Sequence, residues 1–195
     1  MLFQTDRLWY HDPRERREQP MNEIIKAMKE RRSIRKFKAE MPPKEMIEQV
    51  IDAGLYAASG KNEQAVITIA VTNKEFRDKL MKDNRDVGGW AESYDPFYGA
   101  PVILIVLGRK SRITYVYDGS LVIGNMMLAA HSLGLGSIWI HRAKEEFETE
   151  EYQDLLKELG IEGEWEGIGH CALGYMDCEL PAPPQRKDGR VYWIE

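Results

Sequence analysis

The spacing of apolar and polar positions along the chain predicts helices that alternate with single buried strands. Apolar residues at helical spacing predict helices at 22–31 with Asn22 as N-cap, at 42–59 opening on Pro42-Pro43, in a short piece around 76–81, and at 148–159. Continuous or β-branched apolar runs predict strands at 66–72, 101–108, 137–141 and 167–176. This alternation indicates an α/β or α+β sandwich with a mixed central β-sheet flanked by helices.

The segment YDGSLVIGNMMLAAHSLGLGSIWIH, residues 117–141, differs from the other helical segments. Its middle is apolar on nearly every helical face, which predicts a helix that is buried all round and ends at Gly134 and Gly136. A monomer of 195 residues has little room to surround such a helix. Burial against a second copy of the chain is the simpler explanation, so we expect a homodimer.

The composition fits one soluble globular domain. Hydrophobic residues make up 43% of the chain and charged residues 30%, and no apolar run reaches the roughly 20 residues of a membrane span. Residues 1–20 lack the apolar core of a signal peptide, so we expect a loosely ordered N-terminal extension before a single domain, residues 21–195, with an extended tail. Cys171 and Cys178 form no CxxC pattern, and reduced thiols in a cytoplasmic protein are expected.

Other familiar motifs do not point to a dinucleotide site, a metal site or a hydrolase. The stretch GLGS, residues 134–137, follows a helix and precedes a strand, which is the reverse of a dinucleotide-binding fingerprint. His131, His141 and His170 have no partner at a recognised ligand spacing, so no metal site is predicted. A Ser-His-Asp triad stays open, but there is no GxSxG nucleophile elbow and no visible acid–base pair.

The segment ERRSIRKFKAE, Glu30 to Glu40, carries five basic residues between Arg31 and Lys38 on a chain whose formal net charge is −5. The acidic balance argues against a nucleic-acid binder. One interpretation is a solvated helix C-terminus whose cations complement the helix dipole. The other is a phosphate site, because guanidinium groups match phosphate oxygens and Ser33 adds a hydroxyl.

Four stretches, in order, resemble the FMN-dependent nitroreductase family. RRSIRKF, residues 31–37, looks like the phosphate-binding opening of that family, and ASGKNEQ, residues 58–64, is similar to its P-S-x-x-N-x-Q-P-W segment. Residues 118–140 resemble its long dimer-core helix and the following strand, and the proline-rich tail with Arg186-Lys187 is the fourth match. The resemblance covers roughly residues 22–190 and implies an α+β homodimer with FMN at the subunit interface.

The resemblance also implies which residues bind the cofactor. The group for the FMN phosphate and ribityl chain is Arg31, Arg32, Ser33 and Arg35, aided by Arg186 or Lys187. The group that reaches the flavin from the partner subunit is Ser59, Gly60, Asn62 and Gln64. The strand end that passes the flavin ring is Trp139, Ile140, His141 and Arg142, with the backbone N–H of His141 or Arg142 near flavin N5.

The implied activity is that of an FMN-dependent NAD(P)H oxidoreductase with a ping-pong cycle. NADH or NADPH would reduce the flavin at N5 and leave before a small-molecule acceptor, such as a nitroaromatic or quinone, takes its place, so no catalytic side chain is required. Two alternatives stay open: an FMN enzyme of the same fold that performs dehalogenation or flavin fragmentation, and a flavin-binding or redox-sensing module without turnover.

The chain departs from the family pattern in two places. The proline and tryptophan expected around the Asn-Gln loop are missing from residues 58–66, and His141-Arg142 stand where many members have small residues. A bulky cation beside the flavin would narrow the acceptor pocket or favour an anionic acceptor. Both departures bear on the substrate more than on the cofactor.

Overall fold

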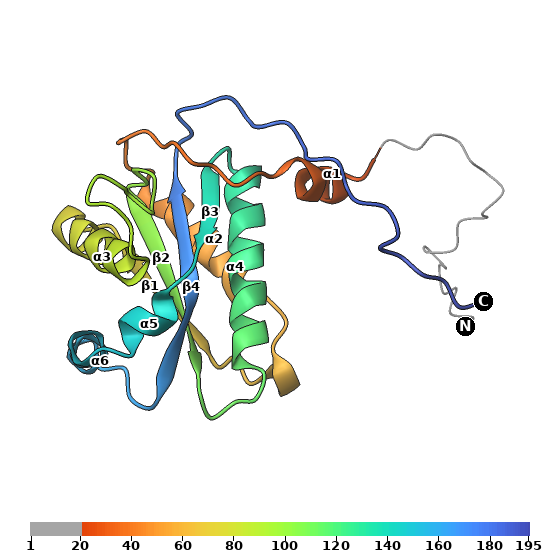
Figure 1. The fold of residues 1–195 in the computed structure, drawn as a ribbon. Coiled ribbons are helices and arrows are strands. Elements are labelled where there is room, and N and C mark those ends of the chain that lie inside the picture. Colours follow the sequence, from red (N-terminus) through yellow and green to blue (C-terminus); the bar gives the residue numbers. More distant parts are fainter. Residues whose placement is uncertain (1–20) are drawn as a thin grey trace, which may run out of the picture.

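The computed structural model describes residues 21–195, and the N-terminal extension lies outside the described residues. One sheet of four strands forms the centre (Figure 1), with its members in the spatial order β1 (Val66–Val71), β2 (Val102–Arg109), β4 (Trp165–Gly174) and β3 (Gly136–Ile140). All three strand pairs are antiparallel. The α+β class is therefore confirmed, whereas parallel pairing is limited, within residues 21–195, to a single bridge between Ser33 and Ser137.

The expectation of a mixed sheet was thus wrong for these four strands, and β2 shows why. Helices cover both faces of the sheet, so side chains on both sides of β2 are buried whatever the direction of its neighbours. A continuous apolar run reports burial on two faces and carries no information on strand direction.

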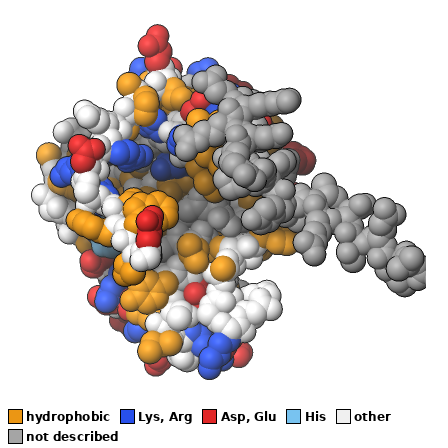
Figure 2. Space-filling model, turned by 90° about the vertical axis from the view of Figure 1, so that its right-hand side faces the viewer, with side chains coloured by type: hydrophobic (Ala, Val, Ile, Leu, Met, Phe, Trp, Pro, Cys, Tyr) orange, Lys and Arg blue, Asp and Glu red, His pale blue; other side chains and the backbone are white. Residues whose placement is uncertain are grey.

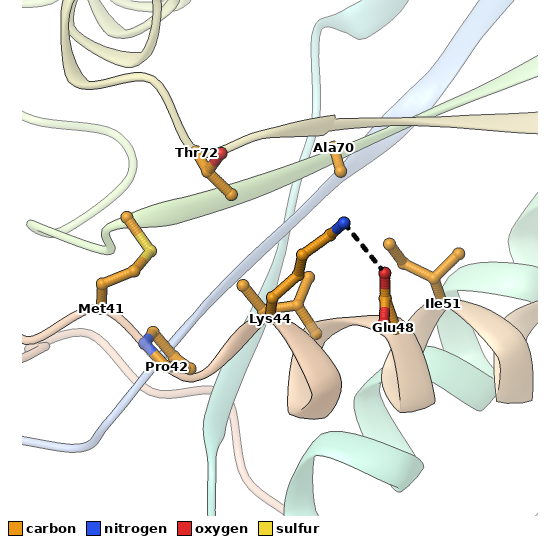
Figure 3. A pocket seen from close by; sticks show the side chains of 8 residues that line it. Met41, Pro42, Lys44, Glu48, Ile51, Ala70 and Thr72 are labelled. Atoms are coloured by element: carbon orange, nitrogen blue, oxygen red, sulfur yellow. Dashed lines mark ion pairs between the residues drawn. The ribbon is translucent and has the colours of Figure 1, made fainter.

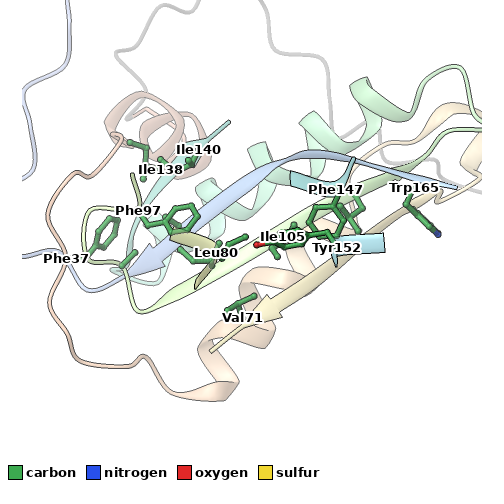
Figure 4. Packing of buried hydrophobic residues seen from close by; sticks show 14 of the residues in the cluster. Phe37, Val71, Leu80, Phe97, Ile105, Ile138, Ile140, Phe147, Tyr152 and Trp165 are labelled. Atoms are coloured by element: carbon green, nitrogen blue, oxygen red, sulfur yellow. The ribbon is translucent and has the colours of Figure 1, made fainter. Parts of the chain in front are cut away.

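Residues 21–195 contain six α-helices: α1 (Glu23–Glu30), α2 (Lys44–Leu55), α3 (Lys74–Val87), α4 (Tyr115–Ser132), α5 (Ala143–Phe147) and α6 (Glu150–Glu158). Helices α2 and α4 pack together on one face, while α3, α5 and α6 cover the other (Figure 1). Alternate residues of β2 point to the two faces, with Ile103 and Ile105 in one apolar cluster and Leu104 and Val106 in the other. Figure 4 shows the first cluster, in which Leu80, Phe97 and Phe147 fill the space between the sheet and its helices.

The helix predictions are confirmed in position but not always in length. Asn22 caps α1, since its Oδ1 accepts a hydrogen bond from the Ile24 N–H at 2.9 Å. Helix α2 ends at Leu55, earlier than the expected 59, and a 3₁₀ turn, η1 (Gly60–Asn62), follows. Helix α3 has 14 residues rather than the short piece predicted. Helix α5 was not predicted, because five residues are too few to show an apolar period.

Helix α4 is buried on one side only in the single chain. Val122, Ile123 and Met126 are buried against the sheet, but the side chains of Tyr117 and Leu121 are 71% and 50% exposed. The single chain therefore leaves one side of α4 open, and its burial against a second copy stays a prediction. Figure 2, which looks onto the face on the right of Figure 1, shows hydrophobic side chains there next to a group of Lys and Arg side chains.

Two further negative findings hold within residues 21–195. No helix there combines the length and the apolar character needed to cross a membrane. The same part of the chain contains no group of three or more His, Cys, Asp or Glu side chains placed to hold a metal ion.

Candidate functional site

The basic segment, Glu30 to Glu40, runs along the edge of the sheet, beside β3 and the residues that directly follow β4. Ser33 forms the parallel bridge to Ser137, and the Ile34 N–H donates to the Ser137 carbonyl at 3.1 Å. Farther on, Phe37 pairs with Met176 directly after β4. Ile34 and Phe37 are buried, so the segment is anchored by its apolar residues while its basic side chains lie at the surface or half-buried.

The arginines of this segment carry charge that the described residues leave uncompensated. Arg31, Arg32 and Arg35 form no ion pair with any carboxylate of residues 21–195, whereas Lys36 lies 2.9 Å from Asp177. The Arg32 Nη1 donates to the carbonyls of Lys29 and Arg31, both at 2.6 Å, which fixes this side chain at the end of α1.

A polar atom in this cluster is left without a partner. The Nε of Arg32 is buried and makes no hydrogen bond within the described chain. Buried donors are nearly always paired in native proteins, and an unpaired one is open to a bound water, an ion or a ligand. Guanidinium donors with the Ser33 hydroxyl fit a phosphate group, and this donor set is what an FMN phosphate requires.

The Asn-Gln loop, residues 58–64, lies at the N-terminal end of α4. The Gly60 N–H donates to both carboxylate oxygens of Asp118, at 3.1 and 3.3 Å, in the first turn of α4. The Gln64 N–H donates to the Ser59 Oγ at 3.1 Å, and Gln64 Nε2 donates to Asn62 Oδ1 at 3.3 Å. Lys61, Asn62 and Gln64 have positive φ angles of 54°, 55° and 48°, a backbone that is costly for residues other than glycine.

The structure therefore does not bring this loop to the basic segment within one chain. Arg31 meets α4 at Met127, with its Nη1 4.0 Å from the methionine sulfur, while the loop meets α4 at Asp118. At about 1.5 Å per residue, these two contacts are separated by about 13 Å along the helix axis.

The end of β3 leads into a strained turn. Ile140 is buried, the Trp139 indole lies against Gly169 of β4, and His141 is exposed. Arg142 follows with a left-handed φ of 82°, and the guanidinium carbon lies 4.1 Å from the centre of the Trp90 ring. The four predicted residues of this strand end are thus together, next to aromatic residues that the sequence did not single out.

The tail residues Arg186 and Lys187 are exposed, and the structure shows no contact between them and the basic segment. The tail leaves β4 and runs away from the sheet (Figure 1). Its aromatic residues are also open, with Tyr192 and Trp193 86% and 81% exposed.

A buried polar network under the β3–α5 turn was missed by the sequence interpretation. Asn84 of α3 donates from Nδ2 to Glu146 Oε1 at 2.6 Å and to the His141 carbonyl at 2.9 Å. Glu146 Oε2 lies 2.7 Å from His170 Nε2, and none of the three side chains is more than 1% exposed. The three residues come from different elements, so no local pattern links them; His170 was considered only as a metal ligand.

Burial sets the protonation of this network. It raises the pKa of Glu146 to about 8, against the opposing effects of the Asn84 hydrogen bond and the Arg142 charge. It also lowers the pKa of His170 to about 3. Because Oε2 and Nε2 lie 2.7 Å apart, the pair shares one proton over the range between these values.

The hollow of about 430 Å³ beside α2 is separate from all these groups. It is lined by residues around the start of α2 and the end of β1, with Pro42 just before α2, Lys44 and Glu48 in α2, and Thr72 just after β1. Figure 3 shows Lys44 and Glu48 facing one another, with 3.4 Å between Nζ and Oε1. No predicted cofactor residue lines this hollow, and its only basic side chain, Lys44, already has a partner.

Comparison with known proteins places this geometry in a family. A protein of Methanothermobacter thermautotrophicus, provisionally named NADH dehydrogenase/NAD(P)H nitroreductase, is 35% identical over 121 residues, 60% of each chain. The FMN reductase [NAD(P)H] of Bacillus subtilis is 31% identical over 60% of this chain and 53% of its own. The chain thus spans little more than half of these two relatives.

Solved structures match over a greater length. The crystal structure of a nitroreductase with bound FMN from Bacteroides fragilis superimposes with a TM-score of 0.81 at 28% identity, covering 89% of this chain and 100% of that one. The nitroreductase family model matches residues 28–175, which include the basic segment, the Asn-Gln loop, α4, and the β3–α5 turn. On this match, the chain belongs to the nitroreductase family.

Proposed function

We propose that this chain binds FMN and acts as an NAD(P)H oxidoreductase towards small acceptors such as nitroaromatics or quinones. The observation that carries the proposal is the set of three arginines beside Ser33, which have no carboxylate partner in residues 21–195 and include a buried, unpaired Nε. Bound FMN would supply the hydride and electron transfer. The FMN of the Bacteroides fragilis nitroreductase and the name of the Bacillus subtilis relative support this choice.

The residues of the chain would bind the FMN and orient its flavin ring. Arg31, Arg32, Arg35 and Ser33 would hold the phosphate beside the start of β3, where Ser33 forms its bridge to Ser137. The turn at His141 would lie along the flavin ring, held from below by the hydrogen bond from Asn84 to the His141 carbonyl. Arg186 and Lys187 would need the tail to cross to another subunit, since in this chain it runs away from the site.

We further propose a homodimer in which two α4 helices pack antiparallel about a two-fold axis. In that arrangement the N-terminal end of one α4 lies beside the C-terminal end of the other. The Asn-Gln loop of the partner, held at Asp118, would then approach the segment at Arg31, which contacts Met127. The exposed side of α4, with Tyr117 and Leu121, supplies the apolar surface for this contact.

Replacing Leu121 by aspartate is expected to break this dimer, because it buries a charge in an apolar interface. Sedimentation velocity should show the wild-type chain as a dimer and Leu121→Asp as a monomer. Leu159→Asp is a matched control, since Leu159 is 52% exposed at the end of α6, on the opposite face of the sheet. A wild-type monomer, or a Leu121→Asp dimer of unchanged stability, would contradict the arrangement.

A cytoplasmic location is part of the same proposal. Cys171 is buried and Cys178 exposed, and both are free thiols. Free thiols persist in reducing compartments.

Turnover is tested with a panel of acceptors. The holoprotein should oxidise NADH or NADPH in the presence of a nitroaromatic or a quinone and release the reduced acceptor. Bleaching of the flavin by nicotinamide without reoxidation by any acceptor would instead indicate a redox-sensing module. Loss of halide from a halogenated aromatic, or fragments of the flavin itself, would indicate the other reactions of this fold.

A further inference from the structure

Arg142 is held in one position by three independent features. Its backbone has a φ of 82°, which is uncommon outside glycine and is strained for a long side chain. Its Nε donates to Asn84 Oδ1 at 3.3 Å. Its guanidinium stacks on Trp90 at 4.1 Å, a cation–π distance. Glycine would occupy this position without strain.

The buried network beneath the turn fixes the direction of the Asn84 amide. Both N–H groups of Asn84 are engaged, with the Glu146 carboxyl and the His141 carbonyl as acceptors. Only the amide oxygen is left to face Arg142, so Asn84 acts as an acceptor that orients the guanidinium Nε. Glu146 Oε2 in turn lies 2.7 Å from His170 Nε2, so the support of Arg142 continues into the buried core.

The guanidinium itself has no counter-charge in the described chain. No carboxylate of residues 21–195 forms an ion pair with Arg142, although the side chain is half-buried. Its Nη groups are therefore available to an anion. Guanidinium groups bind carboxylates and phosphates through two parallel hydrogen bonds.

Aromatic side chains and a second arginine lie on the same surface. Trp90 packs edge-on against Tyr94 with 4.8 Å between ring centres, and Tyr94 and Tyr98 share a hydrogen bond of 2.9 Å between their hydroxyls. That hydrogen bond raises the pKa of Tyr94, and the nearby positive charges of Arg142 and Arg35 oppose the rise. The loop between α3 and β2 adjoins the basic segment, because a Cβ at Gly99 would lie 3.8 Å from the Phe37 carbonyl oxygen.

We propose that Arg142 determines acceptor specificity, binding the carboxylate of an aromatic acceptor whose ring lies against the Trp90–Tyr94 surface. The inference rests on the proposed function, because it assumes that the acceptor is reduced beside the β3–α5 turn. It assigns a substrate class, namely aromatic acceptors that carry a carboxylate.

The test compares two acceptors of nearly equal size, 4-nitrobenzoate and its neutral isostere 4-nitrobenzamide, with the FMN-loaded enzyme. Arg142→Gly removes the guanidinium and suits the φ of 82°, so the fold should be retained. We expect the ratio of kcat/KM for the benzoate to that for the benzamide to fall at least tenfold. Arg142→Lys keeps the positive charge but cannot form two parallel hydrogen bonds to a carboxylate. Its ratio should therefore lie between those of Arg142→Gly and the wild type.

A binding measurement provides a readout that does not depend on turnover. Unreactive benzoate, titrated into the oxidised holoprotein, should perturb the flavin spectrum, with a Kd at least tenfold weaker in Arg142→Gly. Arg109→Ala is the matched control, because Arg109 also stacks on a tryptophan, Trp165, at 5.0 Å but belongs to β2, away from the turn. Both quantities should stay within twofold of wild type in that variant.

Two outcomes would overturn the inference while leaving the proposed function intact. The first is an Arg142→Gly variant that still binds FMN and keeps both the benzoate-to-benzamide ratio of kcat/KM and the benzoate Kd within twofold of wild type. The other is an effect confined to the KM for NADH or NADPH, which would assign the guanidinium to the nicotinamide co-substrate. A wild-type protein that binds no FMN would instead overturn the proposed function, and this inference with it.

Discussion

Replacing Arg32 and Arg35 together by alanine is expected to weaken FMN binding by two orders of magnitude or more, with the dimer largely intact. A hydrogen bond to a charged group contributes about 1.5–3 kcal/mol, so the loss of two such contacts costs about 3–6 kcal/mol of binding free energy. Fluorescence titration of the apoprotein with FMN measures the change in Kd. The effect is large because these donors have no other anionic partner in residues 21–195.

The two arginines differ in what else they do. Arg32 also donates to carbonyls at the end of α1, so its loss could loosen that helix end, which circular dichroism would reveal. Arg35 is exposed, and Arg35→Ala alone should still weaken FMN binding about tenfold or more without affecting the fold. Lys36→Ala/Lys38→Ala is the control of equal charge change in the same segment. Equal effects of the two double variants would mean that general charge, rather than a phosphate site, governs binding.

Replacing Glu146 by glutamine should remove a pH dependence of stability. Glu146 has a pKa raised from 4.5 to about 8, so between these values the folded chain holds a proton that the unfolded chain has lost. Folding stability from this group therefore falls as pH rises through this window. His170, with a pKa lowered from 6.5 to about 3, acts in the opposite sense between those values.

The effects of Glu146 and His170 on the free energy of unfolding cancel in the pH range where both act. Stability therefore depends on pH only below and above that range. Stability should rise from about pH 3 to 4.5, stay level to 6.5, and fall from 6.5 to about 8. At about 1.4 kcal/mol per pH unit, the last decline amounts to about 2 kcal/mol. Other charges that face Glu146 are Asp83 of α3, Arg142 of the turn and Glu145 of its own helix; the first and last raise its pKa and Arg142 lowers it.

Glutamine at 146 mimics the protonated acid, because it can donate to His170 Nε2 and accept from Asn84. Urea unfolding at pH 6.5 and 8 should therefore show a free energy of unfolding that falls in the wild type and stays level in Glu146→Gln. Glu145→Gln, an exposed neighbour on α5, should behave as wild type. A decline of the same size in Glu146→Gln would show that another group titrates in this range.

The sequence predicted the family and most of the elements, because each depends on local patterns, while the phosphate-binding role of residues 31–35 stays a prediction. Ser33 and the arginines lie within five residues, and the apolar period of α4 is continuous over several turns. Strand direction was not predictable from β2, since two-sided burial gives the same apolar run in either direction. The α5 helix was too short to show a period.

The buried polar network beneath the β3–α5 turn could not be predicted from the sequence, for a different reason. Asn84, Glu146 and His170 come from α3, α5 and β4, and only the packing of the two helices on the sheet brings them together. Arg142 was predicted to lie at the flavin, but its partner Trp90 stands 52 positions earlier in the chain. The separation of the Asn-Gln loop from Arg31 along α4 likewise appears only in three dimensions.

Anaerobic titration of the FMN-loaded protein with NADH and with NADPH tests whether this chain is an FMN-dependent NAD(P)H oxidoreductase. We expect the apoprotein to take up FMN to a yellow holoprotein with one FMN per chain, and the flavin absorption to bleach with about one equivalent of at least one nicotinamide. Protein that takes up no FMN, or bound FMN whose spectrum neither nicotinamide changes, would contradict the account.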